Sequence, residues 1–205
     1  MSAAGNLFII AAPSGAGKTS LVRALLEAEP DLRLSISHTT RAPRLREEQG
    51  VHYHFCSRAE FEQMILKQAF LEYADVFGNC YGTSKAGVID ALRAGNDVLL
   101  EIDYQGAQQV RASMPHTVSI FIAPPSLEVL LSRLVKRNED SAEVINRRTR
   151  AAKQEIQHFA EFDFLIVNDA FEVALHDLIA IVRAQRLRTS AQSIRHAELM
   201  AALLA

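Results

Sequence analysis

The feature that most constrains the fold of this chain is a run of small residues that ends in lysine and threonine. The run is Ala12-Pro13-Ser14-Gly15-Ala16-Gly17-Lys18-Thr19. Residues 7–10 before it are apolar and predict a buried strand, and apolar residues recur at helical spacing over 21–26 after it. A strand, a glycine-rich turn and a helix in this order are the context in which such a motif binds phosphate. We therefore predict a nucleotide-binding loop at residues 12–19, rather than a turn that binds nothing.

The chemistry of this loop follows from its backbone and its last two side chains. Backbone N–H groups and the helix N-terminus supply partial positive charge for phosphate oxygens. We expect Lys18 to reach the β- and γ-phosphates and the Thr19 hydroxyl to ligate Mg²⁺, with the remaining metal ligands coming from water and phosphates. Ala12 stands where the general motif has glycine. Ala12 is compatible with the loop only if its φ is negative, so the prediction depends on residues 15–19.

The rest of the chain alternates between apolar strands and helices. We predict further strands at 98–103, 118–122 and 164–167, and helices at 85–94, 105–113, 127–136 and 142–158, followed by two C-terminal helices that begin with 171–187. This pattern predicts an α/β fold, with a parallel sheet flanked by helices. Residues 34–86 differ, because strands at 34–37, 51–56, 70–74 and 79–83 surround a single helix that begins after Ser57. We predict a core formed by residues 1–33, 87–130 and 156–205, a β-rich insertion at 34–86 and a helical lid at 131–155.

Composition narrows the class of protein further. The chain has 205 residues, 49% of them hydrophobic, and a net charge of −2, which gives no reason to expect nucleic acid or a membrane surface as a partner. No apolar run approaches the roughly 18 residues that a membrane helix needs. The two cysteines do not form a disulfide framework, so we expect a reducing, cytoplasmic location.

Acidic and basic residues mark where chemistry is expected beside the loop. Asp103 follows a predicted strand and suits a metal-site or acceptor-site carboxylate, although a capping or buried-pair role is the alternative. Asp103 and Gly106 also match the switch motif of a GTPase, but no lysine of this chain has the aspartate two residues later that reads the base. The segment 131–153 has seven basic and three acidic residues. Arginines in a mobile lid would offset the charge of a transferring phosphoryl group. The alternative is that these residues form a solvated helix face that has no role in the chemistry.

The insertion offers two further groups of polar side chains. Arg41 and Arg44 flank a proline and can meet at one anion, to which Tyr53 and Tyr81 could add hydroxyl donors. His52, His54 and Cys56 alternate along one predicted strand. They are a possible metal trio that lacks a fourth ligand, and a half-buried sheet face is the alternative.

With these features taken together, the chain resembles the guanylate kinase family over almost its full length. The residues that carry the resemblance are Ser14–Thr19, Ser37-His38-Thr39-Thr40-Arg41 with Arg44, Gly78-Asn79 with Tyr81-Gly82-Thr83-Ser84, Glu101-Ile102-Asp103 with Gln105-Gly106, and Ile166-Val167-Asn168-Asp169. The resemblance implies the phosphate-loop NTPase fold with a GMP-binding insertion and a lid. It also implies Mg²⁺-assisted direct transfer of the γ-phosphoryl group of ATP to GMP, and we expect dGMP to be accepted too.

The resemblance also assigns roles to individual residues. It implies that Ser37, Arg41, Arg44, Tyr53 and Tyr81 hold the GMP phosphate, that Glu72 and Thr83 read guanine, that Asp103 helps to organise the acceptor site and metal, and that Asn168 approaches the donor adenine. Arg133, Arg137 and Arg148 match lid arginines, which together with Lys18, Arg41 and Asp103 form the expected catalytic set. The chain departs from the family at Asn138, where glycine is usual after the second lid arginine, and at Ala170, where a second acidic residue is common.

Two alternatives remain beside this interpretation. The first is another nucleoside-monophosphate kinase, against which the pair Glu72 and Thr83 argues. The second is a guanylate-kinase-like module that has lost catalysis and binds phosphopeptides. Such modules usually lose the phosphate loop and the lid arginines, and this chain keeps both. The substrates would be ATP and GMP, and a homodimer or higher oligomer is possible.

Overall fold

A parallel sheet forms the centre of the computed structural model, which describes residues 4–76, 78–137 and 142–205, with side chains described for all of these except 136, 137 and 142–147. Its five strands, in the order in which they lie side by side, are β2 (Leu32–Leu34), β7 (Asp97–Glu101), β1 (Leu7–Ala11), β8 (Val118–Ala123) and β9 (Phe164–Val167). Every neighbouring pair is parallel. The predicted α/β class with a parallel sheet is therefore confirmed.

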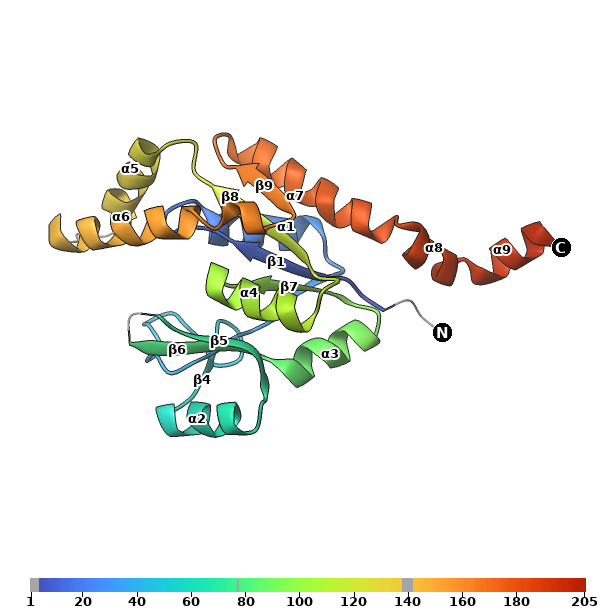
Figure 1. Ribbon diagram of the computed structural model, residues 1–205, viewed down its shortest axis with the longest axis horizontal. Helices are drawn as coiled ribbons and strands as arrows, with labels where there is room; N and C mark the ends of the chain where they lie inside the picture. Colours follow the sequence, from blue (N-terminus) through green and yellow to red (C-terminus); the bar gives the residue numbers. More distant parts are fainter. Residues whose placement is uncertain (1–3, 77, 138–141) are drawn as a thin grey trace.

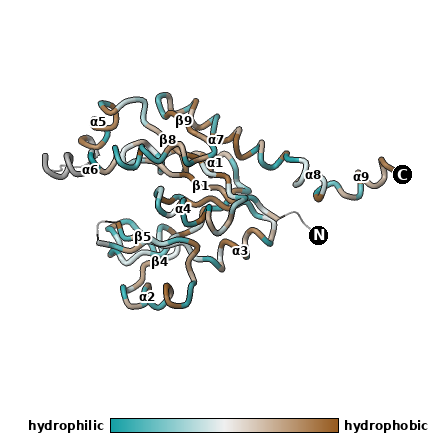
Figure 2. Tube along the Cα trace, in the orientation of Figure 1, coloured by the Kyte–Doolittle hydropathy of each residue, from teal (hydrophilic) through white to brown (hydrophobic). Residues whose placement is uncertain are grey.

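Helices cover both faces of this sheet (Figure 1). Alternate residues of β1 divide between the two faces, so that Phe8 and Ile10 pack toward α1 (Lys18–Ala28) and α7 (Phe171–Arg186). Leu7 and Ile9 pack instead toward α3 (Lys85–Arg93) and α4 (Tyr104–Ser113). Each fully buried side chain of this kind contributes about 1.5–3 kcal/mol to folding. The hydrophobic strands at the centre of Figure 2 are this core.

A second sheet is formed by residues of the insertion. Its order is β4 (His54–Phe55), β3 (His38–Thr39), β6 (Asn79–Ser84) and β5 (Phe70–Val76), and β6 is antiparallel to both of its neighbours. Helix α2 (Arg58–Leu66) follows β4 and begins at a capping box, in which the side chains of Ser57 and Glu60 each accept from the other's backbone N–H. The boundaries 34–86 of the insertion stay a prediction.

Two predicted strands of the insertion differ from the structure. The strand predicted at 51–56 is reduced to His54–Phe55, because residues 51–52 lie in a turn in which the N–H of His52 donates to the carbonyl of Glu48. The strand predicted at 34–37 lies earlier, at β2, where it extends the core sheet beside β7. Alternation of apolar residues alone did not distinguish these short strands from the turns beside them.

Helix α4 joins the insertion to the core. The side-chain amide of Gln109 donates to the carbonyl of Tyr73 at 2.9 Å and accepts from the N–H of Tyr73 at 3.1 Å. This reciprocal pair fixes β5 against α4. Gly106 on α4 allows the carboxylate of Glu72 to approach closely, since a Cβ at position 106 would lie 2.7 Å from Glu72 Oε2.

Two helices between β8 and β9 form the remaining layer over the phosphate loop. Helices α5 (Leu127–Arg137) and α6 (Ala142–Ile156) pack through the buried Leu130, Leu134 and Ala152. The short helix η1 (Phe159–Glu161) then leads into β9. The predicted lid at 131–155 covers parts of α5 and α6, and its movement stays a prediction.

The C-terminal part of the chain extends away from the core (Figure 1). Helix α7 is fixed at its end by ion pairs of Arg183 with Glu29 and of Arg186 with Glu29 and Asp97. Two short helices follow it, α8 (Thr189–Arg195) and α9 (Ala197–Leu204), so the described chain has three helices after β9 where the sequence predicts two. Among the described residues, no helix is both long and apolar enough to cross a membrane.

Candidate active site

The predicted functional residues of the core lie at the carboxyl ends of its parallel strands. The loop of residues 12–17 follows β1, Asp103 comes two residues after β7, and Asn168 follows β9. Ligands of open parallel sheets bind at this edge, outside the ends of the strands. Chain segments more than 150 residues apart therefore meet at one site, as the hydrogen bond from Asn168 Nδ2 to the carbonyl of Ala16 shows directly.

The phosphate loop has the backbone that its glycines predict. Gly15 and Gly17 have φ values of 92° and 93°, in the left-handed region that favours glycine. Ala12 is not among the residues with positive φ, so its departure from the motif is compatible with the loop. Gly17 also permits a close approach, because a Cβ there would lie 2.4 Å from Asn168 Nδ2. The buried Asn168 side chain thus supports the loop from beneath at a distance of 2.7 Å from Ala16.

Both side chains of the loop that are predicted to be functional have partners on β7 or just after it. Lys18 Nζ donates to the carbonyl of Ile102 at 3.0 Å, and the Thr19 hydroxyl donates to Glu101 Oε1 at 2.7 Å. Asp103 Oδ1 accepts from the N–H of Gly106 at 2.8 Å and so caps α4. The capping role left open by the sequence is therefore real, and it fixes the Asp103 carboxylate beside Lys18.

A cavity of 170 Å³ lies between the core and the insertion and joins the predicted residues of both. Its lining includes three residues of the core that bear charge, Lys18, Glu101 and Asp103. The remaining lining residues are Ser37, Tyr53, Glu72, Ala74, Val76, Tyr81 and Ile102. Of the predicted acceptor-site residues, the cavity thus brings together Ser37, Tyr53, Glu72, Tyr81 and Asp103.

Glu72 is a buried carboxyl group in the lining of this cavity, only 4% exposed. The Thr83 hydroxyl, which is fully buried, donates to Glu72 Oε1 at 2.6 Å. Burial, opposed by the hydrogen bond from Thr83 and assisted by the nearby Asp103 charge, raises the pKa of Glu72 to about 7. The group can therefore exchange a proton near neutral pH.

The two arginines of the insertion differ in their surroundings. The guanidinium of Arg41 lies 5.5 Å from the centroid of the Tyr53 ring, and the ring centroids of Tyr53 and Tyr81 are 5.9 Å apart. Arg41 Nη2 also donates to the carboxylate of Glu47. Arg44 is exposed, and its backbone N–H donates to the same carboxylate. Arg41 thus lies beside the cavity, while the Arg44 side chain faces solvent.

Sequence reasoning missed two acidic residues that contact predicted anion-binding groups. Glu47 pairs with Arg41, and the only signal in the sequence was that the acidic pair 47–48 follows a segment with three arginines, at 41, 44 and 46. Glu155 on α6 accepts from the N–H of Ser14 at 3.2 Å, and no pattern in the sequence indicates this contact. Burial raises the pKa of Glu155, opposed by the Ser14 N–H and the Lys18 charge. The Glu155 carboxylate thus accepts from one backbone N–H of the phosphate loop, that of Ser14.

The predicted lid arginines are described to different extents. Arg133 Nη2 donates to the carbonyl of Asn168 at 3.3 Å, and Arg133 Nη1 is buried without a hydrogen-bond partner in the described part of the chain. Arg148 is half-buried on α6. The side chain of Arg137, like Asn138, lies outside the described residues. Leu134 on α5 lies under the loop, 3.2 Å from where a Cβ of Gly15 would be.

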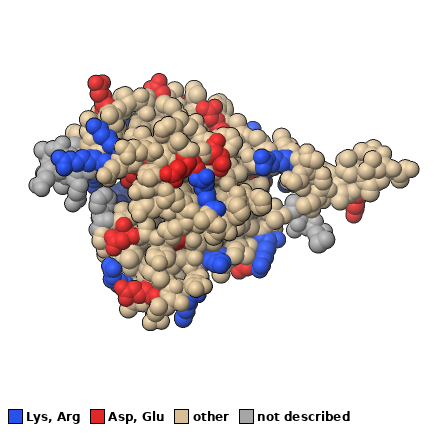
Figure 3. Space-filling view, viewed as in Figure 1, with Lys and Arg blue, Asp and Glu red and all other residues tan. Residues whose placement is uncertain are grey.

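The possible metal trio of the insertion is not assembled. His52 Nδ1 accepts from the N–H of Glu48 within the turn before β4, whereas His54 lies on β4 and Cys56 follows it. Within residues 4–76, 78–137 and 142–205 there is no group of three or more His, Cys, Asp or Glu arranged to hold a metal ion. A larger hollow of 590 Å³ beside His54, Cys56 and α2 contains none of the predicted nucleotide-binding residues. On the face shown in Figure 3, acidic and basic side chains are interspersed.

Comparisons with known proteins match nearly the whole chain. The family model described as guanylate kinase matches residues 4–185. The guanylate kinase of Dechloromonas aromatica (strain RCB) is 58% identical over 196 residues, which are 96% of this chain and 97% of that protein. The guanylate kinase of Escherichia coli (strain K12) is 54% identical over 205 residues, covering 99% of both chains.

A solved structure agrees with these sequence comparisons. The crystal structure of guanylate kinase from Anaplasma phagocytophilum superposes with a TM-score of 0.79 at 33% sequence identity. The match covers 96% of this chain and 94% of that chain. Fold, sequence and the order of the motifs thus point to one family.

Proposed function

Because the chain belongs to the guanylate kinase family, and so phosphorylates GMP to GDP with ATP, we propose that its central cavity binds GMP and that residues 12–19 bind the phosphates of ATP. The observation that carries this proposal is the lining of the cavity. It joins Lys18 of the phosphate loop to Glu72 and Asp103, so donor and acceptor groups would meet at one place. Because the substrate and the product of this reaction are purine nucleotides, we propose that the protein acts in purine nucleotide metabolism.

Guanine recognition is proposed for Glu72 and Thr83. Guanine presents N1–H and the 2-amino group side by side as donors, and an ionised Glu72 can accept from both. Thr83, which donates to Glu72, has a hydroxyl that can turn to the O6 acceptor of the base. Adenine inverts this pattern and would leave a charged acceptor unpaired. Such a mismatch costs on the order of 2–5 kcal/mol.

The phosphate of GMP is proposed to lie against the polar side chains of the insertion. Ser37, Tyr53 and Tyr81 line the cavity, and Arg41 stands beside it. Arg44 could reach the same phosphate from the exposed side of its loop. Hydroxyl and guanidinium donors in this arrangement suit a phosphate dianion. None of these groups is assigned to the ribose 2′-hydroxyl, which is why we propose that dGMP is also a substrate.

Phosphoryl transfer would occur between the two sites. An oxygen of the GMP phosphate attacks the γ-phosphorus, the bond from that phosphorus to the β–γ bridging oxygen breaks, and ADP leaves with that bond's electrons. Lys18 would follow the transferring group, and Asp103 would orient the acceptor. Arg133 has a buried Nη1 that lacks a partner in the described residues, which suits an additional phosphate oxygen. Arg137 and Arg148 are proposed to add charge from the lid.

The residues present fit Mg²⁺, which the family's chemistry requires. Thr19 Oγ1 and Glu101 Oε1 lie 2.7 Å apart beside the loop, and Asp103 lines the cavity together with Glu101. Oxygen ligands of this kind, few in number, are what Mg²⁺ takes when water and phosphates complete its shell. When bound, the ion would neutralise charge on the β- and γ-phosphates. We propose Thr19 as its protein ligand.

The test is a substrate panel. ADP production is measured with ATP and each of GMP, dGMP, AMP, CMP and UMP, with and without Mg²⁺. We expect turnover with GMP and dGMP only, and only with a divalent ion. Preference for another monophosphate would indicate a different kinase on this scaffold, and absence of any turnover would favour a binding module. A cytoplasmic location and a homo-oligomer remain predictions from the sequence.

A further inference from the structure

One carboxylate in the loop between β3 and β4 contacts both arginines of the predicted GMP-phosphate site. Glu47 Oε1 and Oε2 lie 2.9 and 2.8 Å from Arg41 Nη2, and Glu47 Oε2 also accepts from the backbone N–H of Arg44 at 2.9 Å. Only 14% of the Glu47 side chain and 16% of the Arg41 side chain are exposed. This pair is therefore better shielded from solvent than a typical surface ion pair.

The guanidinium of Arg41 is held from further sides as well. Arg41 Nη1 donates to the carbonyl of Ala42 at 2.8 Å, and the guanidinium carbon lies 5.5 and 6.0 Å from the ring centroids of Tyr53 and Phe55. An arginine side chain is flexible, so fixing it costs conformational entropy. A side chain that contacts within the protein already hold in one orientation loses little of that freedom when a ligand binds.

Charge alone would argue against a carboxylate at this position. The ligand is a phosphate dianion, and Glu47 both repels it and neutralises Arg41. Partial desolvation pushes the pKa of Glu47 upward, but hydrogen bonds from the Arg44 N–H and the Arg41 guanidinium hold that pKa below its usual value. Glu47 is thus ionised at neutral pH, and its two possible effects on GMP binding have opposite signs.

We propose that Glu47 is a positioning residue of the acceptor site, which orients Arg41 and fixes the loop at Arg44 without itself contacting GMP. The inference rests on the proposed role of Arg41 in holding the GMP phosphate. Positioning outweighs repulsion because the carboxylate contacts the guanidinium only on Nη2, and a guanidinium has five N–H donors, so donors remain for a phosphate beside the bonds to Glu47, Ala42 and Tyr81. Removing the carboxylate should therefore weaken GMP binding, whereas repulsion alone would make removal strengthen it.

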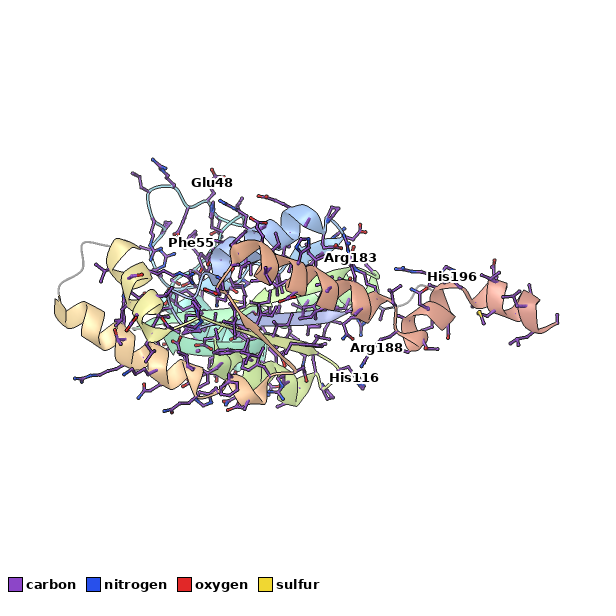
Figure 4. All side chains as sticks on the ribbon, turned by 90° about the horizontal axis from the view of Figure 1, so that it is seen from above. Glu48, Phe55, His116, Arg183, Arg188 and His196 are labelled. Carbon is purple, nitrogen blue, oxygen red and sulfur yellow. The ribbon has the colours of Figure 1, made fainter. Side chains whose placement is uncertain are left out.

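The first experiment compares Glu47→Gln with Glu48→Gln. Glu48 is the adjacent residue, is exposed on the same projecting loop (Figure 4) and undergoes the same change of charge. For Glu47→Gln we expect the KM for GMP to rise about 10-fold or more, with the KM for ATP and the Tm nearly unchanged. Glu48→Gln should leave all of these values close to wild type. A KM for GMP that is unchanged or lower in Glu47→Gln would overturn the proposal.

A double-mutant cycle separates this inference from the role of Arg41. Arg41→Ala should raise the KM for GMP, and adding Glu47→Gln to it should raise the KM much less than in the wild-type background. Fully multiplicative effects would mean that Glu47 acts independently of Arg41, which contradicts the proposal. If Arg41→Ala leaves the KM unchanged, the role of Arg41 itself is wrong and the inference is overturned with it. If only Glu47→Gln is silent, the role of Arg41 stands and the positioning role is wrong.

Discussion

Glu72→Gln should stabilise the protein in the absence of nucleotide, because burial makes the negative charge of Glu72 costly. The pKa of Glu72 in the folded protein is about 7, compared with an ordinary value of 4.5. Between these values the folded protein retains a proton that the unfolded chain has released, so the stability contributed by Glu72 falls as pH rises. This loss of stability is absent below pH 4.5, the ordinary pKa of the group, and complete above about pH 7, its pKa in the folded protein. It amounts to about 3 kcal/mol at pH 8.

Glutamine carries no charge, and its carbonyl oxygen can still accept from Thr83. Relative to wild type, we expect Glu72→Gln to be stabilised by about 3 kcal/mol at pH 8 and by less than about 1 kcal/mol at pH 5. In a protein of this size that corresponds to a rise in Tm of roughly 6–12 °C at the higher pH.

The assay is thermal unfolding of both proteins without nucleotide at pH 5 and pH 8. Glu62→Gln serves as the control, since the Glu62 side chain is 59% exposed and should show little change at either pH. A difference in Tm between wild type and Glu72→Gln that is zero, or that does not grow with pH, would refute the reasoning. It would mean that water or a rearrangement in the empty site relieves the burial of the charge.

Three further predictions concern the same site. Lys18→Met should lower kcat at least ~10²-fold with little change in GMP affinity, which single-turnover kinetics and GMP titration would check. Gly106→Ala should raise the KM for GMP severalfold, since the new Cβ would lie 2.7 Å from Glu72 Oε2 and displace it. An unchanged KM would show that α4 can shift without cost. Glu155→Gln should tighten binding of ATP in calorimetry, because the Ser14 N–H would no longer be paired with a charged competitor. Weaker binding would contradict competition.

The sequence predicted the core of the fold well, for physical reasons that individual elements show. Strand β1 and the loop after it are local features, in which an apolar run, two glycines and a helix follow directly in sequence. The helix stop at Gly95 is also local, and that residue has a φ of 81°. The short strands of the insertion were predicted less well. His38–Thr39 and His54–Phe55 have only two residues each, and their pairing is decided by partners elsewhere in the chain.

The candidate site residues also divide into those that local sequence predicts and those whose contacts depend on long-range packing. Lys18 and Asp103 could be predicted because each follows a recognisable strand. The contacts of Glu155 with Ser14, and of Asn168 with Ala16, join residues more than 130 positions apart. No periodicity or spacing encodes such contacts, since they depend on how α6 and β9 pack beside the loop. The raised pKa of Glu72 could not be predicted either, because it arises from burial in the folded protein.

The most direct test of the account is the choice between GMP and AMP in wild type and in Glu72→Gln, measured as kcat/KM with saturating ATP and Mg²⁺. We expect wild type to prefer GMP by at least ~10³, because AMP would leave the Glu72 carboxylate unpaired. Glu72→Gln should reduce this preference mainly by weakening GMP, since the amide can accept only one of the two bonds well. An unchanged preference in the variant would contradict the assignment of Glu72 to guanine and, with it, the proposed acceptor site.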